Sequence, residues 1–235
     1  MLDNEFECDT LHPVVVYIKR QLADMGDPEK ADQMQAYMKT DQPFYGVQAQ
    51  ARRKIARQAL KKFLITSRKE YEAVIQELWA DDYREVNYQA LEVAELKEFH
   101  SIESFDLYER LVKSAPHWDT LDWLAGKIVS PLVLKHRELE DNLREWNMDE
   151  NFWVRRASLL AHLHHKEELN TELLAEFILR LAHEQEFFIQ KAIGWILRDY
   201  SYVNPDWVSD FVKKHETKLS GLSKREALKK IQKER

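Results

Sequence analysis

The sequence contains few of the residues that end helices, form tight turns or cross-link a chain. Among its 235 residues there are five glycines and six prolines, which leaves little room for the turns that join β-strands. The single cysteine, Cys8, excludes an internal disulfide and fits a reducing compartment. No apolar run approaches the roughly 18 to 20 residues that a membrane helix needs. We therefore expect a soluble cytoplasmic protein with no membrane partner.

The N-terminal residues are acidic, unlike the basic start of a secretory signal peptide. Acidic residues alternate through residues 1–12, which we interpret as an acidic N-terminal tail. No linker rich in Gly, Ser or Pro interrupts the chain after this tail. We therefore expect residues 13–235 to form a single domain, with enough hydrophobic residues, 44% of the chain, to bury a sizeable core.

Apolar residues recur with helical spacing along almost the whole chain, and strand-like alternation is scarce. Residues typical of helix starts precede several of these stretches. Ser67 with Glu70, and Ser223 with Glu226, have the three-residue spacing of capping boxes. These patterns predict an all-α protein.

Similar helix starts recur at residues 81, 117, 149 and 184, at separations of 36, 32 and 35 residues. Small residues occur near the centre of each following helix, where they let neighbouring helices approach closely. A period of this size is that of a helical pair, and stacked pairs bury their apolar stripes on one another. The pattern predicts an α-solenoid, a single curved domain whose concave surface would suit an extended partner.

The net charge of −6 hides an uneven distribution of charged residues. Bases far outnumber acids in residues 39–69 and 213–235, whereas acids dominate residues 70–110. A polyanion could be held by the two basic blocks while the acidic part faces away. Two solvated helix faces explain the same charges equally well.

Motifs for most cofactor chemistries are missing from the sequence. It has no phosphate-binding loop of the Walker type, no dinucleotide fingerprint and no cysteine-rich metal pattern. His162, His164 and His165 cluster, and the first and last share a helix face, but no carboxylate or cysteine pattern completes a metal site. We prefer a solvated or partly packed helix end, and we expect neither a metal nor a cofactor.

One stretch, residues 115–122, places a tryptophan and carboxylates at a helix start. Asp119 has the short acceptor side chain of an N-cap residue, so we expect Trp118 just outside the helix and Asp122 at its third position. An indole four residues before a carboxylate could hold a cation. The same residues also fit an ordinary helix start, with Trp118 as a hydrophobic staple and Asp122 complementing the helix dipole.

Equivalent positions of successive repeats line one face of a solenoid, so residues from three repeats are expected near one another. Beside Trp118 and Asp122, these are Arg156, whose guanidinium needs an anionic partner, and Trp195, which precedes Arg198 by three residues. Two indoles, one carboxylate and two arginines could thus converge. Structural roles stay open as well, because Trp195 lies in an apolar run that fits the core and Arg156 fits a partly buried ion pair.

These residues carry a resemblance to the AlkD family of bacterial DNA alkylation repair enzymes. The similarity covers roughly residues 13 to 232 and is most specific in the block 186–198, which reads EFFIQKAIGWILR. Trp118 and Asp122 look like the family's central motif, except that His117 stands where the family has another tryptophan. The other similar segments are 37–39, 46–48, 52–53, 204–205, 222–227 and the helix of Arg156.

The resemblance implies HEAT-like helical repeats that bind double-stranded DNA on their concave face, in a monomer without cofactor or metal. It implies a monofunctional glycosylase that removes positively charged N3- and N7-alkylated purines in base excision repair. Such an enzyme works on the sugar without enclosing the base, and no lyase activity is expected. The catalytic carboxylate would be Asp122, flanked by Trp118 and Trp195. The residues expected to bind DNA are Arg156, Arg198, Tyr37, Gln48 and Lys191.

A second hypothesis follows from the fold class. Solenoids are usually binding scaffolds, so the chain could be a non-catalytic helical-repeat protein that binds unusual DNA or a protein partner. A pure scaffold has no need of the Asp122 carboxylate, which favours the enzyme. Assays of DNA binding and of base release, run side by side, separate the two hypotheses.

Overall fold

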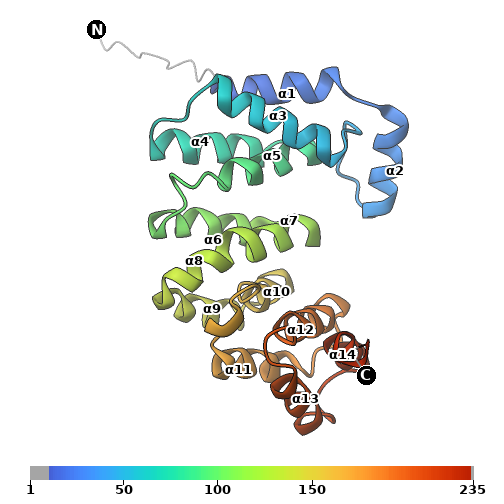
Figure 1. Ribbon diagram of the computed structural model, residues 1–235. Helices are drawn as coiled ribbons and strands as arrows, with labels where there is room; N and C mark the ends of the chain where they lie inside the picture. The colour runs from blue at the N-terminus through green and yellow to red at the C-terminus, as the bar shows by residue number, and fades with distance from the viewer. Residues whose placement is uncertain (1–10, 234–235) are drawn as a thin grey trace. The chain divides into compact units, whose positions relative to one another are not determined.

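The computed structural model describes residues 11–233, and all regular structure in that range is helical (Figure 1). The predicted all-α fold is therefore confirmed. Within this range, no helix is both long and apolar enough to cross a membrane. Most of the predicted acidic tail, with Cys8, falls in residues 1–10 and lies outside the described residues. The contacts divide the chain into two compact units, Met1–Phe99 and His100–Arg235, called here the N-terminal and C-terminal units. The single domain predicted for residues 13–235 stays a prediction.

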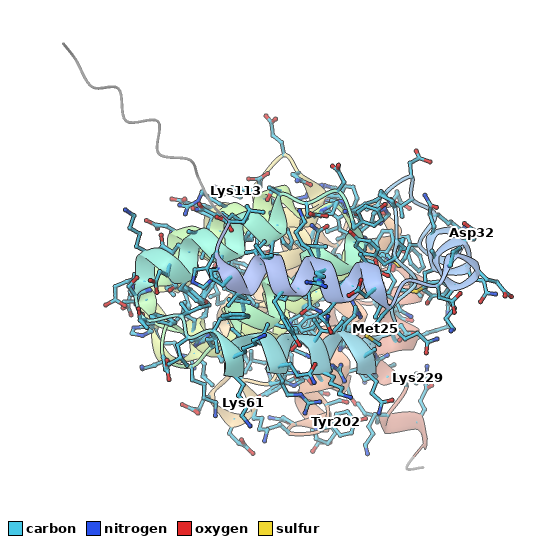
Figure 2. All side chains as sticks on the ribbon, turned by 90° about the horizontal axis from the view of Figure 1, so that it is seen from above. Met25, Asp32, Lys61, Lys113, Tyr202 and Lys229 are labelled. Carbon is cyan, nitrogen blue, oxygen red and sulfur yellow. The ribbon has the colours of Figure 1, made fainter. Side chains whose placement is uncertain are left out.

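The N-terminal unit contains five helices, and the apolar stripes of four of them, all but α2, meet in one core. Helix α1 lies beside α3, and α4 beside α5 (Figures 1 and 2). Ile18, Tyr71 and Leu91 are fully buried between them. Ser67 and Glu70 form the predicted capping box at the start of α4. The helices are α1 (Pro13–Asp24), α2 (Pro28–Met38), α3 (Ala49–Lys62), α4 (Arg68–Trp79) and α5 (Arg84–Ala94).

A buried carboxylate fixes the loop between α2 and α3. Glu85 accepts hydrogen bonds from the backbone N–H groups of Tyr45, Gly46 and Val47, at 3.0, 2.8 and 3.0 Å. Gly46 has a φ of +87°, and a Cβ atom there would lie 2.1 Å from the carbonyl oxygen of Asp27. Only glycine satisfies both the backbone angle and the close approach. Glu85 of α5 thus fixes the loop that leads into α3.

The C-terminal unit contains the remaining helices. Helix α10 packs against α7, α9 and α12, and α14 packs along α12 (Figure 1). Its helices are α6 (Phe105–Ser114), α7 (Trp118–Trp123), a π-helical segment (Leu124–Val129), α8 (Ser130–Lys135), α9 (Glu140–Trp146), α10 (Phe152–Leu160), α11 (Thr171–Leu181), α12 (Phe187–Tyr200), α13 (Pro205–Lys214) and α14 (Gly221–Leu228), with 3₁₀ turns at Ile102–Ser104, Arg137–Leu139, Lys166–Glu168 and Ile231–Lys233.

The second helices of successive repeats follow one another at nearly constant intervals. Helices α5, α7, α10 and α12 begin at residues 84, 118, 152 and 187, which are 34, 34 and 35 residues apart. The interval is more regular than the one predicted from helix-start residues, because those residues precede the first helical turn by varying distances. The helices that carry Trp118, Arg156 and Trp195 are therefore equivalent members of three consecutive repeats.

The start of α7 differs from the prediction. His117, not Asp119, is the N-cap residue, because His117 has an extended backbone (φ −156°, ψ 166°) and Trp118 is already helical. The hydroxyl of Thr120 donates to the carbonyl oxygen of His117 at 3.1 Å, which helps to close this first turn. Asp122 therefore stands at the fifth helical position rather than the third.

After α7 the chain does not leave the helical path but widens into the π-helical segment. Pro131 lies in the first turn of α8, and because proline has no backbone N–H, it cannot continue an α-helical hydrogen-bond ladder. The wider turn accommodates this break. A ring nitrogen of His100 hydrogen-bonds the carbonyl oxygen of Ile128 at 2.7 Å, which gives one acceptor in this segment a partner from outside the helix.

The start of α14 also corrects a prediction. Ser223 and Glu226 do not form a capping box, because the helix begins three residues earlier than expected and Ser220 is its N-cap. The Ser223 hydroxyl instead donates to the carbonyl oxygen of Gln190 in α12 at 2.8 Å. The Glu226 side chain likewise points to α12, where it meets two cations. The residues of the predicted cap thus join two helices.

Candidate functional site

The centre of the C-terminal unit is a buried ion pair between α7 and α10. The guanidinium of Arg156 donates to both carboxylate oxygens of Asp122, with Nε to Oδ1 and NH2 to Oδ2 each at 2.8 Å. A third N–H group of the guanidinium donates to the carbonyl oxygen of Phe188 in α12. The side chains of Arg156 and Asp122 are only 4% and 14% exposed. One arginine therefore ties together the three equivalent helices α7, α10 and α12.

Two opposing effects set the charge state of Asp122. Burial raises the pKa of its carboxyl above that of a free aspartate, and nearby Asp119 adds to this, whereas the hydrogen bonds and the charge of Arg156 lower it. An ionised carboxylate offers about four lone-pair positions, and the bidentate pair occupies two of them. The Asp122 carboxylate, whose position is fixed by Arg156, can therefore still accept hydrogen bonds from another group.

The two tryptophans named from the sequence lie on the same helices as this ion pair. Trp118 precedes Asp122 by four residues in α7, so both side chains lie on one face of that helix. Trp195 follows Phe188 by seven residues, about two turns of α12. Both residues are half-buried. Among residues 11–233, neither indole makes a ring–ring contact or a hydrogen bond.

Sequence reasoning missed a cluster of aromatic rings beside the ion pair. Trp153 packs between Phe188, at 4.8 Å between ring centroids, and His117, at 6.5 Å. The Arg156 guanidinium carbon lies 5.7 Å from the centroid of the Phe188 ring. Phe187, which contacts Phe188, is 55% exposed. The four rings lie in the first turn of an equivalent helix or, for His117, just before one. The recurrence of aromatic residues at these positions was the available sequence signal.

Two of the residues predicted to bind DNA are held by a carboxylate of the protein itself. Glu226 of α14 accepts from Lys191 at 2.9 Å and from Arg198, both in α12. The Lys191 and Arg198 side chains are 37% and 26% exposed, and that of Glu226 is 14% exposed. The pKa of the Glu226 carboxyl is lowered, first by its hydrogen bond with Lys191. It is therefore ionised at neutral pH.

A glycine makes this contact between α12 and α14 possible. A Cβ atom at position 194 would lie 2.5 Å from the Cβ atom of Glu226 and 3.0 Å from the carbonyl oxygen of Ser223. Such distances are well inside ordinary packing contact, so a side chain on Gly194 would force the two helices apart. The small residue expected at the centre of this helix thus sets the position of Glu226.

The other two predicted DNA-binding residues belong to the N-terminal unit. Tyr37 stands near the end of α2 with 76% of its surface exposed. Gln48 is the exposed N-cap residue of α3, and its side chain makes no capping hydrogen bond there. Both are accessible, and their roles stay predictions.

The three clustered histidines do not converge on a common point. His162 and His165 are buried, with ring nitrogens bonded to the carbonyl oxygens of Ser158 and Ser130 at 3.0 and 2.9 Å. His164 has a left-handed backbone (φ 66°) and an exposed side chain that meets Asp199 at 3.5 Å. In the described part of the chain, no group of three or more His, Cys, Asp or Glu side chains is arranged to hold a metal ion.

The buried His162 makes stability sensitive to acid. Desolvation lowers its pKa from 6.5 to about 3, so between these pH values the unfolded chain binds a proton that the folded protein does not. Stability is therefore complete above pH 6.5 and falls as the pH drops toward 3. From pH 7 to pH 5, this one group is expected to cost about 2 kcal/mol of unfolding free energy. Urea unfolding at the two pH values measures it.

The matched variants are His162→Asn and His164→Asn. An asparagine amide can replace the ring nitrogen that bonds to Ser158, and the left-handed backbone of residue 164 also accepts asparagine. His162→Asn should lose about 2 kcal/mol less stability than the wild type over this pH interval, whereas His164→Asn should behave like the wild type. An unchanged acid sensitivity in His162→Asn would contradict the assignment.

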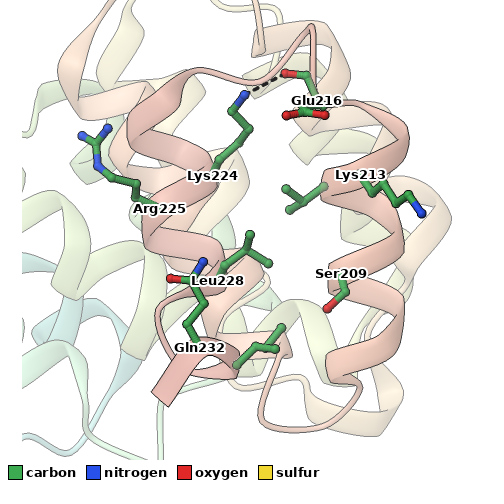
Figure 3. Close-up of a pocket in the computed structure, with 9 residues that line it drawn as sticks. Ser209, Lys213, Glu216, Lys224, Arg225, Leu228 and Gln232 are labelled. Carbon is green, nitrogen blue, oxygen red and sulfur yellow. Dashed lines mark hydrogen bonds between the residues drawn. The ribbon is translucent and has the colours of Figure 1, made fainter. Parts of the chain in front are cut away.

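The C-terminal basic block contributes to a groove between α13 and α14 (Figure 3). The groove has a volume of about 470 Å³, and its lining includes Val212, Leu228 and Lys224. Lys224 donates to the backbone carbonyl oxygen of Glu216 at 3.0 Å. Arg225 points away from α13, on the other side of α14 (Figure 3). The bases of this block therefore do not all face one surface.

Comparison with known proteins shows the family to which the chain belongs. The sequence model of a family described as "DNA alkylation repair enzyme" matches residues 18–231. No curated protein matches the sequence significantly. A solved structure described as a predicted DNA alkylation repair enzyme from Enterococcus faecalis is 34% identical, with a TM-score of 0.79 over 87% of this chain and 95% of that one. The helical-repeat fold is thereby confirmed. The chain belongs to the family of DNA alkylation repair enzymes.

Proposed function

We propose that this protein is a monofunctional DNA glycosylase, which hydrolyses the N-glycosidic bond of positively charged N3- and N7-alkylated purines. Membership of the family gives it a role in the repair of alkylated DNA. The observation that carries the finer proposal is the Asp122 carboxylate, which Arg156 holds by two hydrogen bonds in a helix that also carries the half-buried Trp118. Double-stranded DNA with alkylated purines is the proposed substrate of the monomer.

The chemistry of the substrate explains why so few groups are needed. An N3- or N7-alkylated purine already carries a positive charge and is a good leaving group, so the base need not be protonated. As the glycosidic bond breaks, positive charge develops on the sugar. A fixed carboxylate can stabilise that charge and orient the attacking water, and stabilisation of this kind is usually the largest catalytic contribution. Asp122 supplies it.

The aromatic faces complement the same charges. Trp118 shares a helix face with Asp122, and Trp195 lies on α12, the helix whose Phe188 carbonyl holds Arg156. An indole face attracts a cation by about 0.5 to 2 kcal/mol, depending on desolvation. These tryptophans would therefore favour both the charged lesion and the sugar cation. No deep base pocket is required, because the chemistry takes place at the sugar.

The basic residues have a separate role in DNA binding. Arg156 uses three of its five N–H groups within the protein, and its side chain is only 4% exposed, so its proposed phosphate contact rests on the family resemblance. Tyr37, Gln48, Lys191 and Arg198 complete the proposed contacts. Affinity for DNA should therefore fall as salt concentration rises. The mechanism assigns no lysine nucleophile, so strand cleavage by a lyase step is not part of the proposal.

Base release from alkylated DNA tests the proposal. The purified protein should release N7-methylguanine or N3-methyladenine from methylated duplex DNA, with no release of unmodified purines and no strand breaks. Chromatography of the freed bases and denaturing gels of the strands measure both. DNA binding without release of either methylated base would instead identify a non-catalytic helical-repeat protein, and would refute the glycosylase.

A further inference from the structure

The cations Lys191 and Arg198 of α12 lie between two faces of that helix: the face that carries Phe188 and Trp195, and the face that packs against α14. Each helical residue turns the side chain by about 100°, so Phe188, Trp195, Lys191 and Arg198 fall within an arc of about 80°. Gly194, which contacts α14, lies just beyond the edge of that arc occupied by the two cations. Lys191 and Arg198 therefore border the stripe that carries Trp195. A carboxylate from α14 reaches them there.

Lys191 and Arg198 hold the Glu226 carboxylate as two such cations would hold a phosphate. Arginine and lysine together bind phosphate oxygens by charge-assisted hydrogen bonds. In the protein, Lys191 donates to one oxygen of Glu226 and Arg198 to the other. The two oxygens are thus shared between two cations, as two phosphate oxygens would be. Both cations retain partial exposure, so a phosphate can approach them from solvent.

The carboxylate is held in place by packing as well as by charge. The Ser223 hydroxyl anchors α14 to the carbonyl oxygen of Gln190 at 2.8 Å. The absence of a side chain on Gly194 lets the Cβ atom of Glu226 approach the backbone of α12. Glu226 is therefore presented to Lys191 and Arg198 by a rigid contact. A purely solvated glutamate would not compete for them so effectively.

We propose that Glu226 occupies the place of a DNA backbone phosphate between Lys191 and Arg198, and that DNA binding exchanges the carboxylate for a phosphate. The inference rests on the proposed DNA contact of this face. Glu226 weakens binding to any DNA, because two ion pairs must open before the phosphate is held. The protein thereby gives up affinity for undamaged DNA while keeping the cations preorganised.

The test is the affinity of the full chain for an undamaged duplex, measured by fluorescence anisotropy at several salt concentrations. Glu226→Gln preserves the shape of the side chain and removes its charge. Solvent-accessible ion pairs contribute about 0.2 to 1 kcal/mol each, so the loss of two pairs should let the variant bind about two- to thirtyfold more tightly than the wild type. The slope of log K against log salt should also become steeper, by up to about one. In the wild type, the displaced Glu226 carboxylate takes up salt cations when DNA binds, and the variant has no such carboxylate.

The matched control is Glu216→Gln, which changes the net charge equally in an exposed residue of the same unit. It should raise affinity by less than twofold. If Glu226→Gln binds no better than this control, or binds more weakly, Glu226 is only a structural latch and the proposal is wrong. A thermal unfolding curve establishes that each variant is folded.

Labelling of the wild type gives a second test that needs no variant. A water-soluble carbodiimide with an amine nucleophile modifies accessible carboxylates, and mass spectrometry locates the modified residue. Saturation with DNA should increase the labelling of Glu226 several-fold, because its two partners have left it. Unchanged or reduced labelling would overturn the exchange. A wild type that binds DNA but releases no alkylated base refutes the glycosylase and leaves the Glu226 test intact. A wild type that binds no DNA refutes the proposed function and the exchange together.

Discussion

Replacing Asp122 with Asn should lower the rate of alkylpurine release at least about 100-fold, the usual loss when a principal electrostatic group is removed. Asn keeps the size of the side chain but carries no negative charge to stabilise the sugar cation. Its amide also presents N–H groups to Arg156, so only one of the two present hydrogen bonds can remain. Single-turnover release of N7-methylguanine from duplex DNA measures the rate of the chemical step.

An equivalent substitution at an exposed pair separates catalysis from charge and folding. Asp141 pairs with Arg144 at 2.9 Å, and its side chain is 87% exposed. Asp141→Asn therefore removes the same charge from another aspartate–arginine pair, away from the site, and should leave the rate within about twofold of the wild type. Equal rates in Asp122→Asn and Asp141→Asn would remove Asp122 from the mechanism.

Replacing Arg156 with Ala should cost about 3 to 5 kcal/mol of unfolding free energy, because the change leaves a buried carboxylate without its partner. Asp122 is only 14% exposed and would lose both of its hydrogen bonds. The carbonyl oxygen of Phe188 would lose a donor as well. Urea unfolding at neutral pH measures the difference.

Two further variants show whether the pair acts as a unit. Arg144→Ala breaks two exposed pairs, with Asp141 and Glu176, and should cost less than about 2 kcal/mol. The double variant Asp122→Ala with Arg156→Ala removes both buried charges, so it should cost less than the sum of the two single changes. A loss in Arg156→Ala no larger than that in Arg144→Ala would show that the buried pair contributes little to stability.

The sequence was sufficient to predict the helices and to bring three of them together. Apolar periodicity locates nearly every helix, because each buries one stripe on its neighbours. The repeat interval then places Asp122, Arg156 and Trp195 on equivalent helices. The open question whether Arg156 is an ion-pair partner is answered by its bidentate contact with Asp122.

The remaining features depend on contacts between residues distant in the sequence. Glu226 has the spacing of a capping residue, but the cations of α12 compete for it and prevail. The contacts of Trp153 with His117 and Phe188 join three helix starts, and only the recurrence of aromatic residues at these starts pointed to them. The basic block near the C-terminus was predicted from charge alone, and charge does not specify which side of α14 each base occupies.

The π-helical segment Leu124–Val129 has a consequence for how relatives of this protein are aligned. A π turn contains one more residue than an α turn, so it shifts the angular phase of everything before it relative to everything after it. A relative with the same number of residues but a regular α-helix here would present the position aligned with Asp122 about 100° away around the helix axis, relative to the residues that follow. An aspartate that aligns with Asp122 in a relative is therefore equivalent to it only if the helix has the same angular phase at that position. Sequence identity at the aligned position does not establish this.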